Sequence, residues 1–147
     1  MTDPAALLSG TALATFRLNG QLLAVAEGLA RPGGLTAAWW QVLGAVLPAP
    51  LPASGIAREM GITRQSVQRI ADLLVERGLA AYQPNPAHQR AKLLAPTEAG
   101  RAAVARIAPG HRELAERLAD KLTVDGFGEA LDALRRLSAA LEAVHPD

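Results

Sequence analysis

Arginine and glutamine side chains gather near the middle of the chain, at Arg64, Gln65, Gln68 and Arg69. With about 100° between successive helical residues, Gln65, Gln68 and Arg69 project away from the apolar stripe that contains Val67. An arginine can hold guanine through two hydrogen bonds, and a glutamine can pair with adenine, both in the major groove of DNA. This spacing predicts a helix that buries one side and offers the other to base edges. An ordinary amphipathic helix with a solvated face is the alternative.

Two short helices joined by a tight turn are needed to hold this face in place. Ser54 is a candidate N-cap for a first helix that ends at Gly61, and Thr63 is a candidate N-cap for a second. The small Ala57 permits a close crossing of the two helices. This order is typical of a helix-turn-helix, whose second helix enters the major groove by its N-terminal half. Hydroxyl and backbone N–H groups at Thr63 and Ser66 suit phosphate.

The residue pattern changes after the helix-turn-helix, in residues 79–96. Two short non-helical runs flank a Pro-Asn-Pro turn, which predicts a β-hairpin. A helix-turn-helix with an appended hairpin is a winged helix. Arg90 lies just past the hairpin tip, where an arginine can enter a minor groove, and Lys92 is placed to meet phosphate. A solvated loop cation is the alternative interpretation of both residues.

Longer helices are predicted on both sides of this unit. Apolar residues recur at helical spacing in both, and their leucines exceed what an isolated winged helix needs, which favours a dimer. Pro109 and Gly110 are expected to kink or interrupt the helix that Thr97 begins. The predicted helices are 7–30, 36–47, 54–60, 63–77, 97–121 and from Thr123 or Asp125 onward, with residues 48–52 as an extended connector.

The composition fits one small globular domain with appendages. The chain has 147 residues, half of them hydrophobic, so a sizeable core is expected. No apolar run approaches the roughly 20 residues that cross a bilayer, and the N-terminus lacks the pattern of a secretory signal. The absence of cysteine excludes disulfides and thiolate metal sites and fits a cytoplasmic location. Between residues 53 and 97, six lysines and arginines stand against three acids, so the positive charge is local.

No arrangement for catalysis occurs in the sequence. It contains no phosphate-binding glycine loop and no nucleophile beside a base. The three histidines, His88, His111 and His145, are far apart and lack the spacing of metal ligands. We therefore expect neither enzymatic activity nor a bound metal or cofactor.

Three stretches of the chain carry a likeness to a known family. They are "LTAAWWQVL" (residues 35–43), "SGIAREMGITRQSVQRIADLLVERGLA" and "NPAHQRAKLLAPTEAG". They resemble, in turn, the second helix, the helix-turn-helix and the wing of the multiple-antibiotic-resistance regulator (MarR) family of winged-helix transcription factors. The likeness covers about residues 35–101. It implies a mainly α fold with a small β-hairpin wing, in which a winged helix-turn-helix is flanked by N- and C-terminal dimerisation helices.

The resemblance also implies an organisation and a function. Residues 1–34 would form the N-terminal dimerisation helix, 35–97 the winged helix-turn-helix DNA-binding region, and 98–147 the C-terminal dimerisation helices. The chain would act as a homodimer, most often a repressor, on a pseudo-palindromic operator in double-stranded DNA, released by a small-molecule effector. By position, bases and phosphates would be contacted by Ser54, Thr63, Arg64, Gln65, Ser66, Gln68, Arg69 and the wing-tip Arg90, beside the phosphate contact expected of Lys92.

One position departs from the pattern of the family. The family commonly has an aspartate two residues before the wing arginine, which orients it, and here His88 stands there. A neutral imidazole cannot form the same ion pair with Arg90. A histidine can instead become charged near neutral pH, which would strengthen DNA binding as pH falls.

Effectors of the resembling family often bind between the dimer helices and the DNA-binding lobe. Phe16, Trp39 and Trp40 are the candidate lining residues of such a pocket, with Trp40 expected to belong mainly to the core. Two alternatives to an effector-released regulator stay open. One is a winged helix used for protein contact, and the other is an architectural DNA-binding factor that needs no effector.

Overall fold

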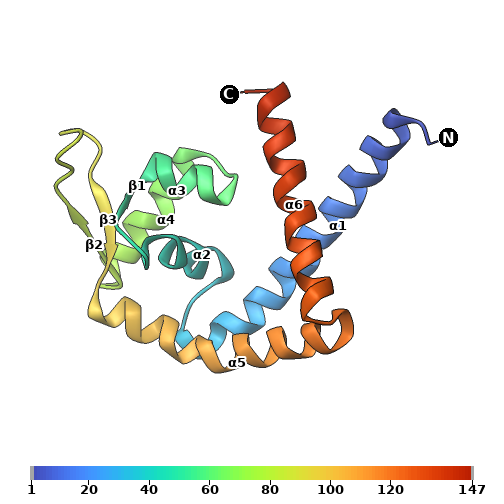
Figure 1. The fold of residues 1–147 in the computed structure, drawn as a ribbon. Coiled ribbons are helices and arrows are strands. Elements are labelled where there is room, and N and C mark those ends of the chain that lie inside the picture. Colours follow the sequence, from blue (N-terminus) through green and yellow to red (C-terminus); the bar gives the residue numbers. More distant parts are fainter. Residues whose placement is uncertain (1, 147) are drawn as a thin grey trace. The chain divides into compact units, whose positions relative to one another are not determined.

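The computed structural model describes residues 2–146 and is mainly helical, with one small antiparallel sheet (Figure 1). It confirms the predicted fold class, a mainly α chain with a winged helix-turn-helix. The chain divides into two compact units between Ala108 and Pro109. No helix within residues 2–146 has the length and apolar character needed to span a membrane. The elements are α1 (Pro4–Ala30), η1 (Arg31–Gly33), α2 (Ala37–Val46), β1 (Leu51–Pro52), α3 (Ala53–Met60), α4 (Arg64–Glu76), β2 (Ala80–Gln83), β3 (Leu93–Pro96), α5 (Glu98–Leu122) and α6 (Val124–Val144).

An apolar core holds the first unit together. α2, α3 and α4 gather beside the sheet, and each turns one side toward the core (Figure 1). β3 and the first part of α5 add further side chains to it. Each large side chain that is fully buried contributes about 1.5–3 kcal/mol to folding. The largest of these are Leu43, Ile56, Leu74, Leu94, Ile107, Val42, Val46 and Val67.

Two oxygen atoms hold the N–H groups at the start of α2. Thr36 Oγ1 accepts a hydrogen bond from the Trp39 amide at 3.1 Å, as a capping threonine does. Glu27 Oε1, from α1, accepts from the Ala37 amide at 3.0 Å. A carboxylate at this end of a helix also suits the helix dipole. The predicted cap is confirmed, and the last turns of α1 are tied to the start of α2.

β3 is the central strand of the sheet. β2 pairs with it in antiparallel fashion, with Ala80 opposite Pro96, which confirms the predicted hairpin. β1 pairs with the other edge of β3, with Leu51 opposite Leu94. The sequence predicted only an extended connector at β1, because a two-residue strand among prolines leaves no alternating pattern to detect.

α5 begins in a tightly packed corner against the hairpin. Thr97 Oγ1 accepts from the Gly100 amide at 3.1 Å and donates to the Gly78 carbonyl at 2.6 Å. The predicted cap of this helix is therefore confirmed. A Cβ on Gly100 would overlap the Leu79 carbonyl oxygen. Only glycine lets the helix backbone come this close to the start of the hairpin.

One predicted cap is wrong, and of the two effects expected at Pro109, a kink or a break in α5, the break does not occur. Ser54 does not cap α3, because β1 keeps the chain extended to Pro52 and the helix begins directly after it, without a side-chain cap. Pro109 does not interrupt α5, which is continuous through it. A proline removes one N–H donor from a helix. The carbonyl that loses its partner belongs to Ala105, an exposed residue that water can reach.

The second unit consists of the last part of α5 and the whole of α6. The last helix was predicted to begin near Thr123 or Asp125; Thr123 caps it, and Thr123 Oγ1 accepts from the Gly126 amide at 3.0 Å. No residue of α6 is buried. The apolar residues of this helix therefore remain partly exposed within the described chain.

Candidate nucleic-acid interface

The helix-turn-helix forms as the sequence predicts. Gly61 ends α3 with φ +67°, a left-handed conformation that glycine adopts without strain, and its N–H bonds to the Ala57 carbonyl. Ala57 is itself buried. α4 then buries Val67 and Leu74 and leaves its opposite side exposed. The buried stripe and the polar face of α4 are thus confirmed.

The first turn of α4 is arranged to meet an anion. Thr63 Oγ1 accepts from the Ser66 amide at 3.1 Å and donates to Ser66 Oγ at 2.9 Å. This leaves the Ser66 hydroxyl proton available as a donor. The amides of Arg64 and Gln65 have no partner within the helix, as is usual for a first turn. The partial positive charge of these amides favours phosphate.

A groove of about 920 Å³ lies between α4 and the wing, which we define as residues 80–96. No aspartate or glutamate contributes to its lining in the part of the chain that the structure describes. Its polar lining is made instead of cations, amides and hydroxyls, so a polyanion fits it. Six of the predicted contact residues line the groove: Ser54, Arg64, Gln65, Gln68, Arg90 and Lys92. The other three, Thr63, Ser66 and Arg69, lie at or near the start of α4 outside the groove.

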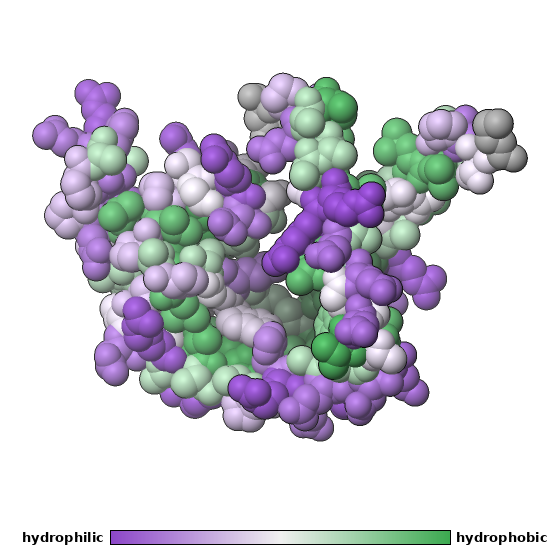
Figure 2. Space-filling model, in the orientation of Figure 1, coloured by the Kyte–Doolittle hydropathy of each residue, from purple (hydrophilic) through white to green (hydrophobic). Residues whose placement is uncertain are grey.

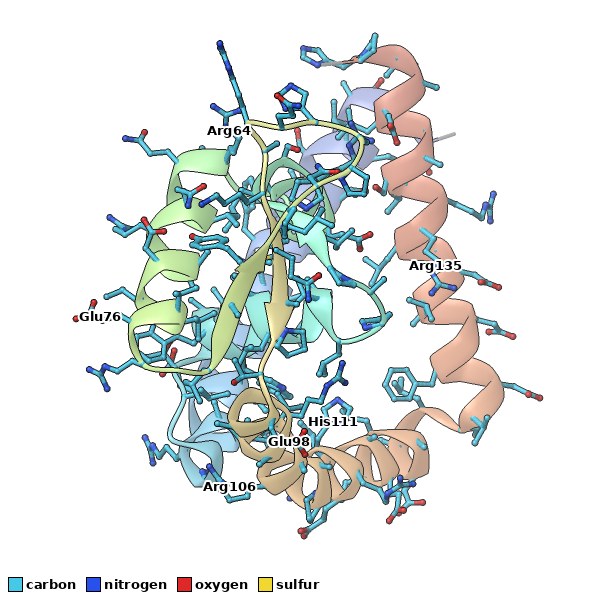
Figure 3. All side chains as sticks on the ribbon, turned by 90° about the vertical axis from the view of Figure 1, so that its left-hand side faces the viewer. Arg64, Glu76, Glu98, Arg106, His111 and Arg135 are labelled. Atoms are coloured by element: carbon cyan, nitrogen blue, oxygen red, sulfur yellow. The ribbon has the colours of Figure 1, made fainter. Side chains whose placement is uncertain are left out.

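Charge is distributed unevenly along α4. Arg64 stands at the end of the helix beside the wing loop, and Glu76 stands at the opposite end (Figure 3). Asp72, the other acid of the helix, also lies in its second half. The half of α4 that a helix-turn-helix inserts into DNA is therefore the half without acids.

An asparagine fixes the shape of the wing loop. Asn85 Nδ2 donates to the Ala91 carbonyl at 2.8 Å, and Asn85 Oδ1 accepts from the Ala87 amide at 3.0 Å. The surface of the wing tip is hydrophilic (Figure 2). His88 is exposed, and within residues 2–146 no hydrogen bond or ion pair restrains the Arg90 guanidinium. The loop is thus held by its backbone, while the arginine head is free to adjust.

Two residues that the sequence interpretation did not assign belong to this site. Tyr82 of β2 lines the groove, and its O–H donates to Asp72 Oδ1 of α4. Burial, and then the nearby Asp72 carboxylate, raise the pKa of Tyr82 from 10.0 to about 12, so the phenol keeps its proton to a higher pH than an ordinary tyrosine does. Asp72 lies on the exposed face of α4. Nothing in the sequence indicates its pairing with a residue ten positions away.

The three aromatic residues predicted to line an effector pocket lie away from the groove. Trp39 and Trp40 are partly buried against the core. The Arg77 guanidinium carbon lies 5.4 Å from the centre of the Trp39 ring, a cation–π contact. Phe16 lies on α1, and 70% of its surface is exposed. None of the three lines the groove, so an effector pocket at these residues stays a prediction.

The terminal helices expose apolar residues that a partner could cover. Ala30 is the one buried residue of α1, and α6 has none. Hydrophobic surface is visible on the N-terminal arm that α1 forms (Figure 2). The exposed apolar side chains include Leu7, Leu8, Leu13, Phe16 and Leu22 on α1, and Leu131, Leu134, Leu137, Leu141 and Val144 on α6.

Comparisons with known sequences agree with this geometry. A sequence profile of the MarR family matches residues 33–91, which run from the end of η1 into the wing. An uncharacterised protein of Mycobacterium tuberculosis is 39% identical over 131 residues, which cover 89% of this chain and 92% of the relative.

Solved structures share the fold. The M. tuberculosis transcriptional regulator MosR in complex with DNA has a TM-score of 0.75 at 23% identity, covering 91% of this chain and 97% of that chain. CouR from Rhodococcus jostii, bound to p-coumaroyl-CoA, has a TM-score of 0.66 at 23% identity, covering 93% of each chain. The solved structures share the fold of this chain over most of its length. The family match identifies residues 33–91, the winged helix-turn-helix part of the chain, as a member of the MarR family.

Proposed function

We propose that the chain is a homodimeric repressor that binds a pseudo-palindromic operator in double-stranded DNA. The observation that carries this proposal is the groove between α4 and the wing, lined by cations and amides and by no carboxylate among the described residues. Such a lining attracts phosphate through charge and can read base edges through hydrogen bonds.

The roles of the individual residues follow from their positions around this groove. Arg64 and Gln65, at the start of α4, are assigned to base edges in the major groove. Thr63 and Ser66 lie at the helix start and are assigned to phosphate, as is Ser54 across the groove. We place Arg69 on a base edge as well, one turn further along the exposed face.

The wing supplies the second part of the contact. Arg90 has no restraining partner within residues 2–146 and lies close to the wing tip, so its guanidinium can follow a narrow minor groove. Lys92, a point charge on a flexible stem, is assigned to phosphate. Because phosphate contacts carry no sequence information, Lys92 would add affinity and Arg90 would add a preference for A·T-rich flanks.

Dimerisation is supported by the exposed apolar faces of α1 and α6. Leu131, Leu134 and Leu137 recur at spacings of three along α6 and are nearly half exposed. Covering them with a second copy of the chain would form a symmetric interface. A two-fold dimer places its two recognition helices about one turn of DNA apart, which requires an inverted repeat in the operator.

A small-molecule effector would release the repressor from DNA. Phe16, Trp39 and Trp40 are the aromatic side chains that we assign to its pocket, and the related fold of CouR holds an aromatic coenzyme A thioester. An effector-operated repressor of this kind would act in the cytoplasm, where the operator and the effector are both present.

Selection of bound fragments from a random DNA pool tests this function. Purified full-length chain at a stated salt concentration should enrich an inverted repeat whose half-sites lie about one helical turn apart. Binding to all fragments with equal affinity would favour an architectural factor instead. Failure to retain DNA at all would favour a protein-contact module and would overturn the proposal.

A further inference from the structure

A cluster of three polar side chains joins α4 to the wing. The Tyr82 O–H of β2 donates to Asp72 Oδ1 of α4. Gln68, one turn before Asp72 on the same helix, donates from Nε2 to Asp72 Oδ1 at 3.0 Å and to Tyr82 Oη at 2.8 Å. A hydrogen bond to an ionised carboxylate is roughly twice as strong as one between neutral groups. Asp72 therefore holds the cluster together, and we call Tyr82, Asp72 and Gln68 the wing clamp.

The wing clamp leaves Gln68 able to contact DNA. Tyr82 Oη and Asp72 Oδ1 are hydrogen-bonded to each other, so they lie on the same side of the Gln68 amide nitrogen. Within residues 2–146, no further hydrogen bond engages the Gln68 carboxamide, which also lines the groove. Gln68 therefore keeps both a donor and an acceptor for base edges. What the clamp adds is a connection between a residue of the reading face and the wing.

The place of Tyr82 on β2 suits it to hold the wing. Side chains alternate along a strand, so Ala80 and Tyr82 turn toward the core while Ala81 and Gln83 are exposed. β2 ends at Gln83. Tyr82 is thus the last side chain of β2 that faces α4 before the chain enters the wing loop. A tyrosine has few rotatable bonds, so this connection is rigid.

The wing loop, residues 84–92, extends past the sheet beyond Tyr82 (Figure 1). None of its residues is buried. Within residues 2–146, the loop forms no hydrogen bond or ion pair with α4, and Asn85 instead bonds to Ala87 and Ala91 of the loop itself. Arg90 and Lys92 face α4 across the groove of about 920 Å³. The loop therefore fixes its own shape, whereas its angle to α4 depends on contacts at its base.

We propose that Tyr82 and Asp72 are positioning residues that set the angle between α4 and the wing, so that Arg90 meets the minor groove while α4 occupies the major groove. Ordering a mobile segment during binding costs affinity, and a segment that is already ordered avoids this cost. The wing clamp orders the wing before DNA arrives. This inference rests on the proposed function, since it requires α4 and the wing to contact one duplex.

The angle of the wing is measured first without DNA. The chain has no cysteine, so spin labels can be attached at Glu76→Cys on α4 and Ala87→Cys in the wing loop, both exposed positions. An excess of unlabelled chain ensures that only distances within one chain are recorded. The distance distribution should be narrow, and Tyr82→Phe should broaden it, because the ring remains and the bond to Asp72 is lost. Gln83→Ala, on the opposite face of β2, is the matched control and should leave it narrow.

Binding to the selected operator then tests the placement of Arg90. The operator is prepared with A·T-rich and with G·C-rich flanks where the wing lies. The wild-type chain should prefer the A·T-rich form, whose narrow minor groove attracts an arginine. Tyr82→Phe should bind that form about fivefold more weakly, the effect of one hydrogen bond, and should lose most of the preference. Its preference at the base that Arg64 reads should match the wild type, which a general structural defect would not allow.

A double-mutant cycle shows whether Tyr82 acts through Arg90. In an Arg90→Ala chain there is no guanidinium to position, so adding Tyr82→Phe should change operator affinity by no more than about twofold. Asp72→Asn is the second clamp variant and should also reduce the preference for A·T-rich flanks. The flank preference is the measure for this variant, because the lost charge also changes attraction to phosphate in general. Melting temperatures establish that all the variants are folded.

The outcomes separate this inference from the function on which it rests. A wild-type chain that enriches no sequence overturns the proposed function and, with it, the placement of Arg90. Where an operator is enriched, an equally narrow distance distribution in Tyr82→Phe overturns only the inference. So does a wild-type chain without any flank preference, a Tyr82→Phe variant that keeps the preference, or an equal cost of Tyr82→Phe with and without Arg90.

Discussion

The winged helix and the terminal helices both carry leucines at helical spacing, but only the winged helix buries them within the chain. In the winged helix, Leu43 and Leu74 are fully buried. On α6, Leu137 and Leu141 recur at the same helical spacing, yet they are 48% and 63% exposed. The first set closes a core within one chain. The second set stays uncovered although its helix is regular from end to end.

The difference shows that a helix pattern predicts burial without saying what covers the helix. α4 is short, and its stripe meets α2, α3 and the sheet. α6 is longer, and none of its residues is buried within this chain. An exposed apolar face of this length is typical of an interaction surface. We therefore expect substitutions in the two regions to fail in different ways.

The largest effect is expected at the apolar face of α6. The double variant Leu134→Asp, Leu137→Asp should weaken a dimer by about 3–6 kcal/mol. In a symmetric interface each substitution removes one leucine from both subunits, so its effect counts twice. Sedimentation equilibrium should show monomers at concentrations where the wild type is dimeric. Arg135→Ala, on the same helix between them, is the control and should leave the assembly intact (Figure 3). A wild-type chain that is already monomeric would contradict the prediction.

A smaller but still large effect is expected in the winged helix when a methyl group is added. Gly100→Ala should lower the free energy of unfolding by about 3 kcal/mol, because the new Cβ overlaps the Leu79 carbonyl oxygen and the backbone must move. Urea unfolding measures the loss. Gly44→Ala in α2 is the matched control, since its Cβ would meet nothing within 4 Å. Equal stability of the two variants would show that the corner around Gly100 is not tightly packed.

The sequence predicted most of this fold because its signals are local. Thr36, Thr63 and Thr97 each cap the helix that they were expected to begin, and Thr123 caps the helix that was expected to begin near Thr123 or Asp125. A capping threonine acts on amides two or three residues away, so its neighbours suffice to identify it. β1 was missed because its two residues become a strand only through pairing with β3, which lies about forty residues later.

The candidate site was predictable to the same extent. Gln65 and Gln68 follow from their spacing on one helix and Arg64 from its place in the family pattern, and the structure brings them together with Arg90 and Lys92. The hydrogen bonds that join Tyr82 of β2 to Gln68 and Asp72 of α4 were not predictable. They depend on how β2 sits against α4, and no local pattern in the sequence contains that information.

A third, smaller effect on DNA binding distinguishes a cation assigned to a base, Arg64, from a cation assigned to phosphate, Lys92. Arg64→Ala should cost about 1–3 kcal/mol of binding to the selected operator and relax the base preference at one position, because an arginine contact to guanine is specific. Lys92→Ala should weaken binding evenly across sequences and reduce the slope of log affinity against log salt by about one. Titrations of operator and unrelated DNA at several salt concentrations measure both. If the two variants showed the same base preference and the same salt dependence, the assignment of Arg64 to a base and of Lys92 to phosphate would be wrong.

The smallest effect concerns pH and is confined to the winged helix. The pKa of Tyr82 is raised from 10.0 to about 12 by burial and by Asp72, so between these values the folded chain keeps a proton that the unfolded chain has lost. The stabilising contribution of the protonated phenol is therefore complete below pH 10 and is lost as pH rises toward 12. Tyr82 is the single tyrosine of the chain, so the absorbance of tyrosinate reports this group alone.

Asp72→Asn sharpens this titration, because it removes the negative charge next to the phenol. The midpoint should move down from about 12 toward the ordinary value of a tyrosine, while burial keeps it above 10. Leu137→Asp in the terminal region is the control and should leave the midpoint in place. A wild-type midpoint near 10 would mean that the phenol is exposed to solvent and that its hydrogen bond to Asp72 does not form.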